Sequence, residues 1–262
     1  MERIQNRINQ LFESSMKDVL NVYFTAGYPS LEDTLTVAQY LNDSGADIIE
    51  IGMPFSDPVA DGPTIQESNT VALQNGMSIR KLFEQLEGLR EHVSIPVILM
   101  GYLNPVLQYG IEQFCEKCQQ VGIDGLILPD LPMHEYLEHY KEKFERYGLK
   151  NIFLITPQTS EERIRVIDDN TDGFIYMVSS ASTTGARSEI GDSQRHYFKR
   201  IAEMGLKNPT LIGFGISNRE TFKNAAAHAN GAIIGSAFIK LLHAEGPDEQ
   251  MIKKFIKDIK HQ

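Results

Sequence analysis

One glutamate stands out in the sequence because it lies in an apolar run. Residues 46–51 read Ala-Asp-Ile-Ile-Glu-Ile, a pattern typical of a buried strand, and Glu50 lies near the carboxyl end of that run. A buried carboxylate is costly unless it is paired or functional. Burial also raises a carboxyl pKa toward neutrality, which suits a general acid or base. Glu50 is therefore the first candidate catalytic residue, and an ion pair at the mouth of the sheet is the alternative.

A second candidate carboxylate follows in a loop that proline and glycine constrain. Residues 57–63 read Asp-Pro-Val-Ala-Asp-Gly-Pro, so Asp57 and Asp61 should point in defined directions. Asp61 could act on a substrate, or it could cap a helix that begins near Thr64. The spacing alone leaves both interpretations open.

Other catalytic groups are missing from the places where they would be expected. No strand-like run carries a lysine near its carboxyl end, which argues against a Schiff base. The seven histidines form no metal-like cluster, which argues against zinc-assisted chemistry. Cys115 and Cys118 could form a redox or metal half-site, but an amphipathic helix is the simpler interpretation. Acid–base catalysis with electrostatic help remains.

Glycines near the ends of the last two strand-like runs indicate a phosphate site. Residues 213–217 read Gly-Phe-Gly-Ile-Ser, residues 235–236 read Gly-Ser, and residues 183–186 in an earlier loop read Thr-Thr-Gly-Ala. Glycines let backbone N–H groups approach an anion, and helix N-termini add a favourable dipole. Barrel enzymes often bind phosphate in the loops after strands seven and eight. Each glycine alone could equally form a tight turn.

Eight short apolar runs alternate with helical patterns and would position these residues. Most are rich in Val, Ile and Leu without polar alternation, which is typical of parallel strands buried on both faces. Eight such units predict the α/β class and favour a closed (β/α)8 TIM barrel over an open doubly wound sheet. The runs are 19–24, 46–51, 96–102, 125–129, 151–156, 173–178, 209–214 and 231–236.

Three segments depart from a minimal barrel. A helix at about residues 2–14 precedes the first strand and should close the bottom of the barrel. Long stretches at 53–75 and 179–192 follow strands two and six, on the face where barrel active sites lie. No linker or shift in composition divides the chain, so residues 1–262 should form a single domain. Helix caps are expected at Ser30, Ser160 and Ser217.

Charge and hydropathy limit the partners of the chain. Its 262 residues carry a formal net charge of -10, which disfavours binding to nucleic acid or anionic lipid. The polar N-terminus lacks the apolar core of a signal peptide, and no apolar run approaches the roughly 20 residues of a membrane span. We expect a cytoplasmic protein that binds a phosphorylated substrate mainly through backbone amides.

The motifs together resemble the tryptophan synthase alpha chain family, over essentially the whole chain. Residues 24–29, 50–63, 128–132 and 213–217 carry the resemblance, and the stretch from Glu50 to Pro63 is highly specific. The resemblance implies a lyase of tryptophan biosynthesis that cleaves indole-3-glycerol phosphate to indole and D-glyceraldehyde 3-phosphate by a retro-aldol step. It also implies a partner, a beta chain containing pyridoxal phosphate, in an α2β2 heterotetramer. The alpha chain itself would hold no cofactor.

The resemblance also implies roles for individual residues. Glu50 would be the acid and base for indole C3 and the hydroxyl, Asp61 would face the indole N–H, and Tyr176 would lie close to Glu50. Tyr176 and the apolar residues of the pocket could equally be barrel core. The implied phosphate contacts are Gly185, Gly215, Gly235 and Ser236, with Thr184 closing the loop, and the implied indole pocket is Phe24, Ile65, Met100, Ile127, Phe214 and Ile233.

One loop departs from the family pattern. The family often reads Gly-Val-Thr-Gly after strand six, where this chain has Ser182-Thr183-Thr184-Gly185. Thr184 and Gly185 are retained, so closure through Thr184 stays plausible, although the replaced glycine should change the flexibility of the loop. Two other hypotheses stay open: another phosphate-binding barrel, such as a sugar-phosphate isomerase or epimerase, and a barrel that only activates the beta chain.

Overall fold

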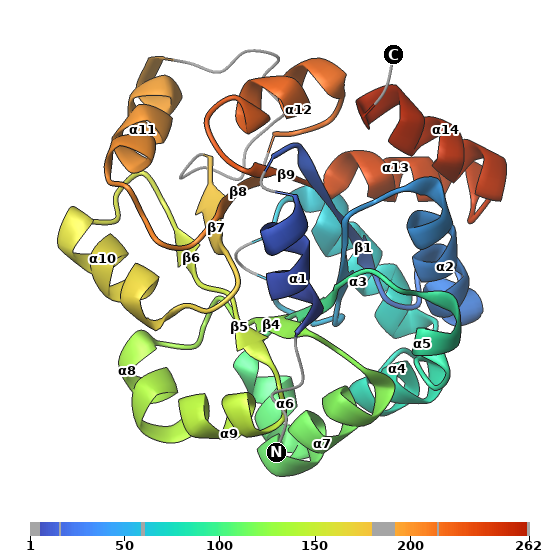
Figure 1. Ribbon diagram of the computed structural model, residues 1–262. Helices are drawn as coiled ribbons and strands as arrows, with labels where there is room; N and C mark the ends of the chain where they lie inside the picture. Colours follow the sequence, from blue (N-terminus) through green and yellow to red (C-terminus); the bar gives the residue numbers. More distant parts are fainter. Residues whose placement is uncertain (1–5, 16, 59–60, 180–191, 214, 261–262) are drawn as a thin grey trace.

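A closed parallel sheet forms the centre of the molecule, with helices around it (Figure 1). The computed structural model describes residues 6–15, 17–58, 61–179, 192–213 and 215–260. Within them, the hydrogen-bonded strand order is β5-β4-β3-β2-β1-β9-β8-β7-β6, and the paired strands are parallel. The strands are β1 (Val19–Thr25), β2 (Ile48–Gly52), β3 (Val97–Met100), β4 (Gly125–Ile127), β5 (Lys150–Asn151), β6 (Leu154–Ile155), β7 (Ile175–Val178), β8 (Thr210–Gly213) and β9 (Gly231–Ile234).

The two ends of this strand order are pieces of one extended segment. Only Ile152 and Phe153 separate β5 from β6. Ile152 donates a backbone hydrogen bond to Leu126 at 2.9 Å, and Tyr176 donates one to Phe153 at 2.9 Å. The segment therefore joins both ends of the sheet and closes it. The predicted (β/α)8 TIM barrel is confirmed, with its fifth strand broken into two short pieces.

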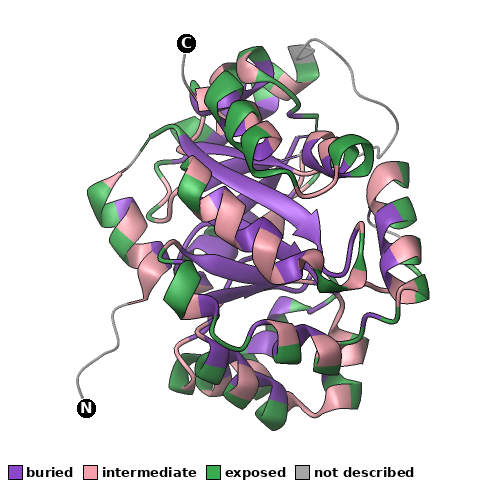
Figure 2. Cartoon of the chain, turned by 90° about the vertical axis from the view of Figure 1, so that its right-hand side faces the viewer, coloured by how far each residue is buried: buried purple, intermediate pink, exposed green. Residues whose placement is uncertain are grey.

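Helices cover the outside of the barrel, and buried residues concentrate on the strands (Figure 2). The segment after β2 contains an additional helix, α3, which accounts for its predicted extra length. The helical elements are α1 (Arg7–Ser14), η1 (Leu31–Asp33), α2 (Thr34–Ser44), α3 (Pro63–Gln74), α4 (Ile79–Gln85), α5 (Leu89–His92), α6 (Leu103–Tyr109), α7 (Ile111–Val121), α8 (Met133–Glu135), η2 (Tyr136–Tyr140), α9 (Lys141–Arg146), α10 (Glu161–Asn170), α11 (Asp192–Glu203), α12 (Arg219–Ala226), α13 (Ser236–Glu245) and α14 (Glu249–Lys260). None of these described helices combines the length and apolar character that a membrane span needs.

Two of the three predicted helix caps are confirmed. The Ser30 N–H donates to the carboxylate of Asp33 at 3.0 Å, and the Ser160 hydroxyl accepts from the N–H of Arg163. The predicted cap at Ser217 is wrong by one residue. Asn218 caps α12 instead, because its side chain and that of Thr221 form a reciprocal capping box.

Helix α1 closes the N-terminal end of the barrel, as the sequence predicts. Ile8 and Phe12 belong to the same buried cluster as Ile48 on β2 and Phe174, the residue just before β7. The rings of Phe12 and Phe174 lie 6.0 Å apart, and Figure 1 shows α1 lying across the barrel. The bottom of the barrel is therefore filled with apolar side chains.

We expect Ile8→Ala to destabilise the protein by about 2–5 kcal/mol, because truncation of a fully buried side chain leaves a cavity. Gln10→Ala on the exposed side of α1 should stay within about 0.5 kcal/mol of the parent chain. Urea unfolding measures both changes. Equal unfolding midpoints for the two variants would show that α1 is not an integral part of the barrel core.

Candidate active site

Glu50 lies inside the barrel, on β2. Its side chain is only 1% exposed, and its neighbours along the strand, Ile49 and Ile51, pack in the outer core. Burial raises the pKa of Glu50 from its ordinary 4.5 to about 8, a hydrogen bond lowers it in part, and the charge of Asp61 raises it further. That hydrogen bond comes from Asn21 Nδ2, which lies 2.7 Å from Glu50 Oε2. Among the described residues, Glu50 is thus held by an uncharged amide, and none of the ion pairs found there includes it.

Asp61 lies just before α3 and is 8% exposed. Burial raises its pKa to about 6. The capping alternative is wrong, since Gly62 is the N-cap of α3 and no side chain caps that helix. The influence of Asp61 on the pKa of Glu50 places the two carboxyl groups in one electrostatic environment.

Two tyrosines complete this environment. Tyr176 on β7 and Tyr23 on β1 are each 5% exposed. The pKa of Tyr176 is raised by burial first and then by the charges of Glu50, Asp61 and Tyr23. Burial, followed by Asp61, likewise raises the pKa of Tyr23. The structure therefore brings Glu50, Asp61 and Tyr176 together, as the sequence predicts, and adds Tyr23.

Glycines on neighbouring strands make room for both tyrosines. A Cβ atom on Gly52 would collide with the Tyr23 hydroxyl, and one on Gly213 would collide with the Tyr176 hydroxyl. Both glycines lie at the carboxyl ends of their strands, β2 and β8. Larger residues there would displace the rings from the site.

A small cleft opens next to these groups at the carboxyl ends of the strands. It brings the carboxyl group of Asp61 next to apolar and aromatic side chains. The ring of Tyr102 at its edge stacks on Phe55, with centroids 4.8 Å apart. The cleft is lined by Tyr23, Met53, Asp61, Asn69, Met100, Gly101, Tyr102 and Pro129.

Four of the predicted pocket residues lie around this region. Met100 lines the cleft itself. Ile127 and Ile233 belong to the inner barrel cluster against which Met100 packs. A Cβ atom on Gly235 would lie 3.4 Å from the Tyr23 ring and 3.6 Å from Ile65, so these three residues are neighbours.

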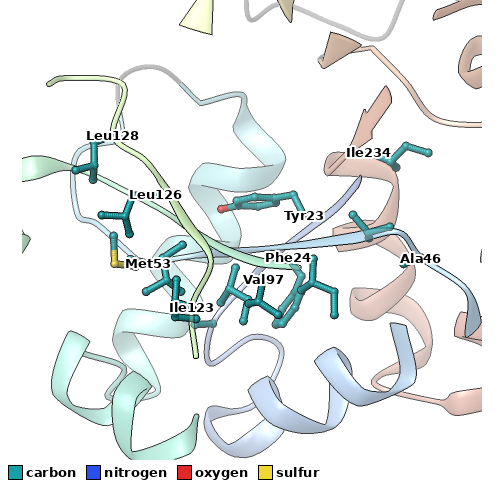
Figure 3. Close-up of a cluster of buried hydrophobic side chains, with 14 of the residues drawn as sticks. Tyr23, Phe24, Ala46, Met53, Val97, Ile123, Leu126, Leu128 and Ile234 are labelled. Atoms are coloured by element: carbon teal, nitrogen blue, oxygen red, sulfur yellow. The ribbon is translucent and has the colours of Figure 1, made fainter. Parts of the chain in front are cut away.

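Phe24 does not belong to this group, and its assignment to the pocket needs correction. Neighbouring residues of a strand point to opposite faces, and Tyr23 faces the cleft. Phe24 is fully buried and pairs with Ile51 of β2, whereas Tyr23 pairs with Glu50, so the two rings lie on opposite faces of the sheet. Figure 3 shows the two rings on opposite sides of their strand. Tyr23 takes the place that was predicted for Phe24.

The predicted phosphate residues are described only in part. Gly235 is the N-cap of α13, no side chain caps that helix, and Ser236 is its first residue. Gly215 has a positive φ of 77°, a conformation that favours glycine. Thr184, Gly185 and Phe214, as well as Ser182 and Thr183, lie outside the described residues.

Two residues of the site were missed at the sequence level although a signal was present. Asn21 is a polar residue in an apolar strand, which is the signal that identified Glu50. Tyr23 lies two residues further and therefore on the same face. Nothing comparable marks the other missed lining residues, Met53, Asn69, Gly101, Tyr102 and Pro129.

The described side chains offer little to a metal ion. Among them, no three His, Cys, Asp or Glu residues are grouped in a way that could hold one. Cys115 and Cys118 are buried, unpaired thiols on α7, where burial raises the pKa of Cys115 to about 12. This placement agrees with the interpretation of the segment as an amphipathic helix.

Known proteins match the chain over nearly its full length. A family model described as tryptophan synthase alpha chain matches residues 10–261. The tryptophan synthase alpha chain of Flavobacterium psychrophilum is 61% identical over 254 residues, which cover 97% of this chain and 99% of the relative. That of Bacteroides thetaiotaomicron is 57% identical over 253 residues, covering 97% and 98%.

Solved structures agree with these matches. The tryptophan synthase A-subunit of the hyperthermophile Pyrococcus furiosus has a TM-score of 0.84 at 38% identity, covering 93% of this chain and 98% of that chain. Tryptophan synthase from M. tuberculosis, in an aminoacrylate-bound form, has a TM-score of 0.84 at 28% identity, covering 97% and 98%.

The burial of Glu50 should make stability depend on pH. Because its pKa is higher in the folded than in the unfolded chain, the parent protein should lose stability as pH rises from about 4.5 to about 8. Glu50→Gln keeps the shape and the acceptor for Asn21 but carries no charge. It should be more stable than the parent near pH 9, by on the order of a few kcal/mol, and this advantage should shrink toward pH 5. Urea unfolding between about pH 5 and pH 9 measures the difference in stability between the two proteins. A difference that does not change with pH would contradict the raised pKa of Glu50.

Proposed function

The chain belongs to the tryptophan synthase alpha chain family, and from this premise we propose how Glu50 and Asp61 carry out its reaction. As an alpha chain it cleaves indole-3-glycerol phosphate to indole and glyceraldehyde 3-phosphate and passes the indole to the beta chain. It is a lyase of tryptophan biosynthesis. This membership decides against a sugar-phosphate isomerase or epimerase.

Cleavage of the bond between indole C3 and the glycerol chain requires one protonation, one deprotonation and one hydrogen bond. C3 must gain a proton so that the ring can accept the electron pair of the breaking bond. The hydroxyl on the adjacent carbon must lose its proton as that carbon becomes an aldehyde. The ring N–H needs a hydrogen-bond acceptor while positive charge builds on the indole. Since the protonated indole is itself the electron sink, we propose that this chain uses no cofactor and that pyridoxal phosphate belongs to the beta chain.

Glu50 can transfer both protons in a closed cycle. With a pKa of about 8, it is mostly protonated at neutral pH and can donate its proton to C3. The carboxylate that forms then accepts the proton of the glycerol hydroxyl as the carbon–carbon bond breaks. The second transfer restores the carboxylic acid, so the cycle consumes no proton overall.

Asp61 suits the complementary role. Its pKa of about 6 leaves it mostly ionised at neutral pH, and it lines the cleft. An ionised carboxylate there would accept a hydrogen bond from the indole N–H and stabilise the developing positive charge. The observation that carries the proposal is this pair of buried carboxyls, whose environments place their pKa values on either side of neutrality.

The remaining surfaces suit the two ends of the substrate. We propose that Tyr23, Ile65 and Met100 contact the indole ring, with Ile127 and Ile233 beneath them. The glycerol phosphate would lie at Gly215, Gly235 and Ser236, where the N-terminus of α13 has no side-chain cap and can offer N–H groups to an anion. The roles of Thr184, Gly185 and Phe214 in this arrangement rest on their match to the family motif.

The partner follows from the family. We propose that the chain pairs with a beta chain in an α2β2 assembly through the side that carries the segment after β2. Asp57 in this segment is exposed and accepts a hydrogen bond from Ser56. One of the matching structures is a tryptophan synthase complex from Pyrococcus furiosus, with a TM-score of 0.83. We place the reaction in the cytoplasm, because charged phosphorylated metabolites are retained inside cells.

Glu50→Gln should abolish indole release, because an amide cannot exchange the proton that C3 and the hydroxyl require. We expect a loss of at least about 10²–10⁴-fold in kcat, with substrate binding retained. An assay of indole release from indole-3-glycerol phosphate, with and without a beta chain, measures this loss. Calorimetric titration with the substrate tests binding by the inactive variant.

The matched variant Asp61→Asn should also lose most activity, because a neutral amide stabilises positive charge on the indole less well than a carboxylate. Near-normal turnover by Glu50→Gln would remove the proposed proton cycle. Near-normal turnover by Asp61→Asn would remove only its own role. Failure of the parent protein to release indole would refute the reaction as a whole.

A further inference from the structure

Asn21 is the polar side chain most closely associated with Glu50. It lies on β1 and is fully buried, with Nδ2 donating to Glu50 Oε2 at 2.7 Å. Its other polar atom, Oδ1, is buried as well and has no hydrogen-bond partner among the residues that the structure describes. An unpaired buried acceptor destabilises a fold, so its presence beside the proposed acid–base residue calls for an explanation.

The strand register places Asn21 below Glu50. Asn21 on β1 pairs with Ile48 on β2. Tyr23 and Glu50 form the next pair of inward-facing residues, two residues closer to the carboxyl ends of these strands. Asn21 is not part of the cleft, which Tyr23 and Asp61 line. It therefore holds Glu50 from the side opposite to the substrate and can act on Glu50 without touching the substrate.

We propose that Asn21 is a positioning residue that serves Glu50 in both of its protonation states. Nδ2 donates to the carboxylate, as the structure has it. After a half-turn of the amide, the unpaired Oδ1 accepts the hydrogen of the carboxylic acid. This inference rests on the proposed proton cycle of Glu50, in which both states alternate in each turnover.

An amide suits this position better than other side chains. A lysine or arginine would keep the glutamate ionised and unable to protonate C3. An aliphatic residue would leave the carboxylate without a donor after it has given up its proton. Asparagine provides one donor and one acceptor on a short side chain and carries no charge.

The other titratable groups around Glu50 either disfavour its ionised form or are themselves uncharged. Among the described residues, Asp61 before α3, Tyr23 on β1 and Tyr176 on β7 interact with it electrostatically. Burial and Asp61 raise the pKa of Glu50, whereas the hydrogen bond from Asn21 lowers it. Removal of the amide should therefore raise this pKa further and disfavour the carboxylate that forms during the reaction.

The test is the pH dependence of kcat/KM for indole release by two variants. Asn21→Leu keeps a similar volume without hydrogen bonding, and Asn21→Asp keeps the shape but replaces the amide with an acid. In both, the basic limb, where activity falls as Glu50 loses its proton, should move to higher pH. For Asn21→Leu, kcat should also fall about 10- to 100-fold with little change in KM, the size expected for a hydrogen bond to a charged group.

Asn151→Leu on β5 is the matched control. Asn151 is another buried strand asparagine, and both of its side-chain polar atoms lack partners among the described residues. This variant should leave the basic limb and kcat unchanged, and thermal unfolding checks that all variants are folded. An unmoved basic limb in both Asn21 variants would overturn the inference. If the parent chain releases indole and Glu50→Gln does not, that outcome would leave the proposed function intact.

Discussion

The carboxyl group of Glu50 is buried in the barrel interior, where the amide of Asn21 donates a hydrogen bond to it, and the rest of the site is arranged around it. Burial favours the neutral acid and raises its pKa to about 8. The hydrogen bond from Asn21 limits that shift, so the proton can still leave. A fully solvated glutamate would be ionised at neutral pH, and an ion-paired one even more so. Either would lack the proton that cleavage of the substrate requires.

The scaffold meets this constraint by dividing the barrel interior in two. The lower part is mostly apolar and is closed by Ile8 and Phe12 of α1, and Asn21 is the polar side chain that contacts Glu50 from below. Towards the carboxyl ends of the strands, Gly52 and Gly213 leave space for two tyrosine rings beside the carboxyls. The same interior thus supplies the low polarity that shifts the pKa of Glu50 and the opening through which a substrate can reach it.

Local patterns in the sequence predict the barrel and single out Glu50, whereas the role of Asp61 comes from the family resemblance, because its spacing alone leaves helix capping open. Apolar strands separated by helices predict the fold, and a glutamate in such a strand is recognisable as a candidate catalytic residue. Apart from the cap of α12, the error in the site concerns side-chain direction, which depends on neighbouring strands. Phe24 is an apolar aromatic residue as predicted, but it lies on the face of β1 opposite to Tyr23, which lines the cleft. Asn21 is a polar residue in an apolar strand, but its hydrogen bond to Glu50 depends on the register of β1 against β2, which the sequence does not show.

The protonation state of Glu50 tests the account most directly. Carbon-13 NMR of the protein labelled at its glutamate carboxyl carbons reports each carboxyl separately, and the Glu50→Gln variant identifies the resonance of Glu50 by its absence. The account predicts a resonance that shows a carboxylic acid at neutral pH and titrates near pH 8. Titration near the ordinary value of 4.5 would show that Glu50 has no proton to donate at neutral pH and would contradict the proposed cycle.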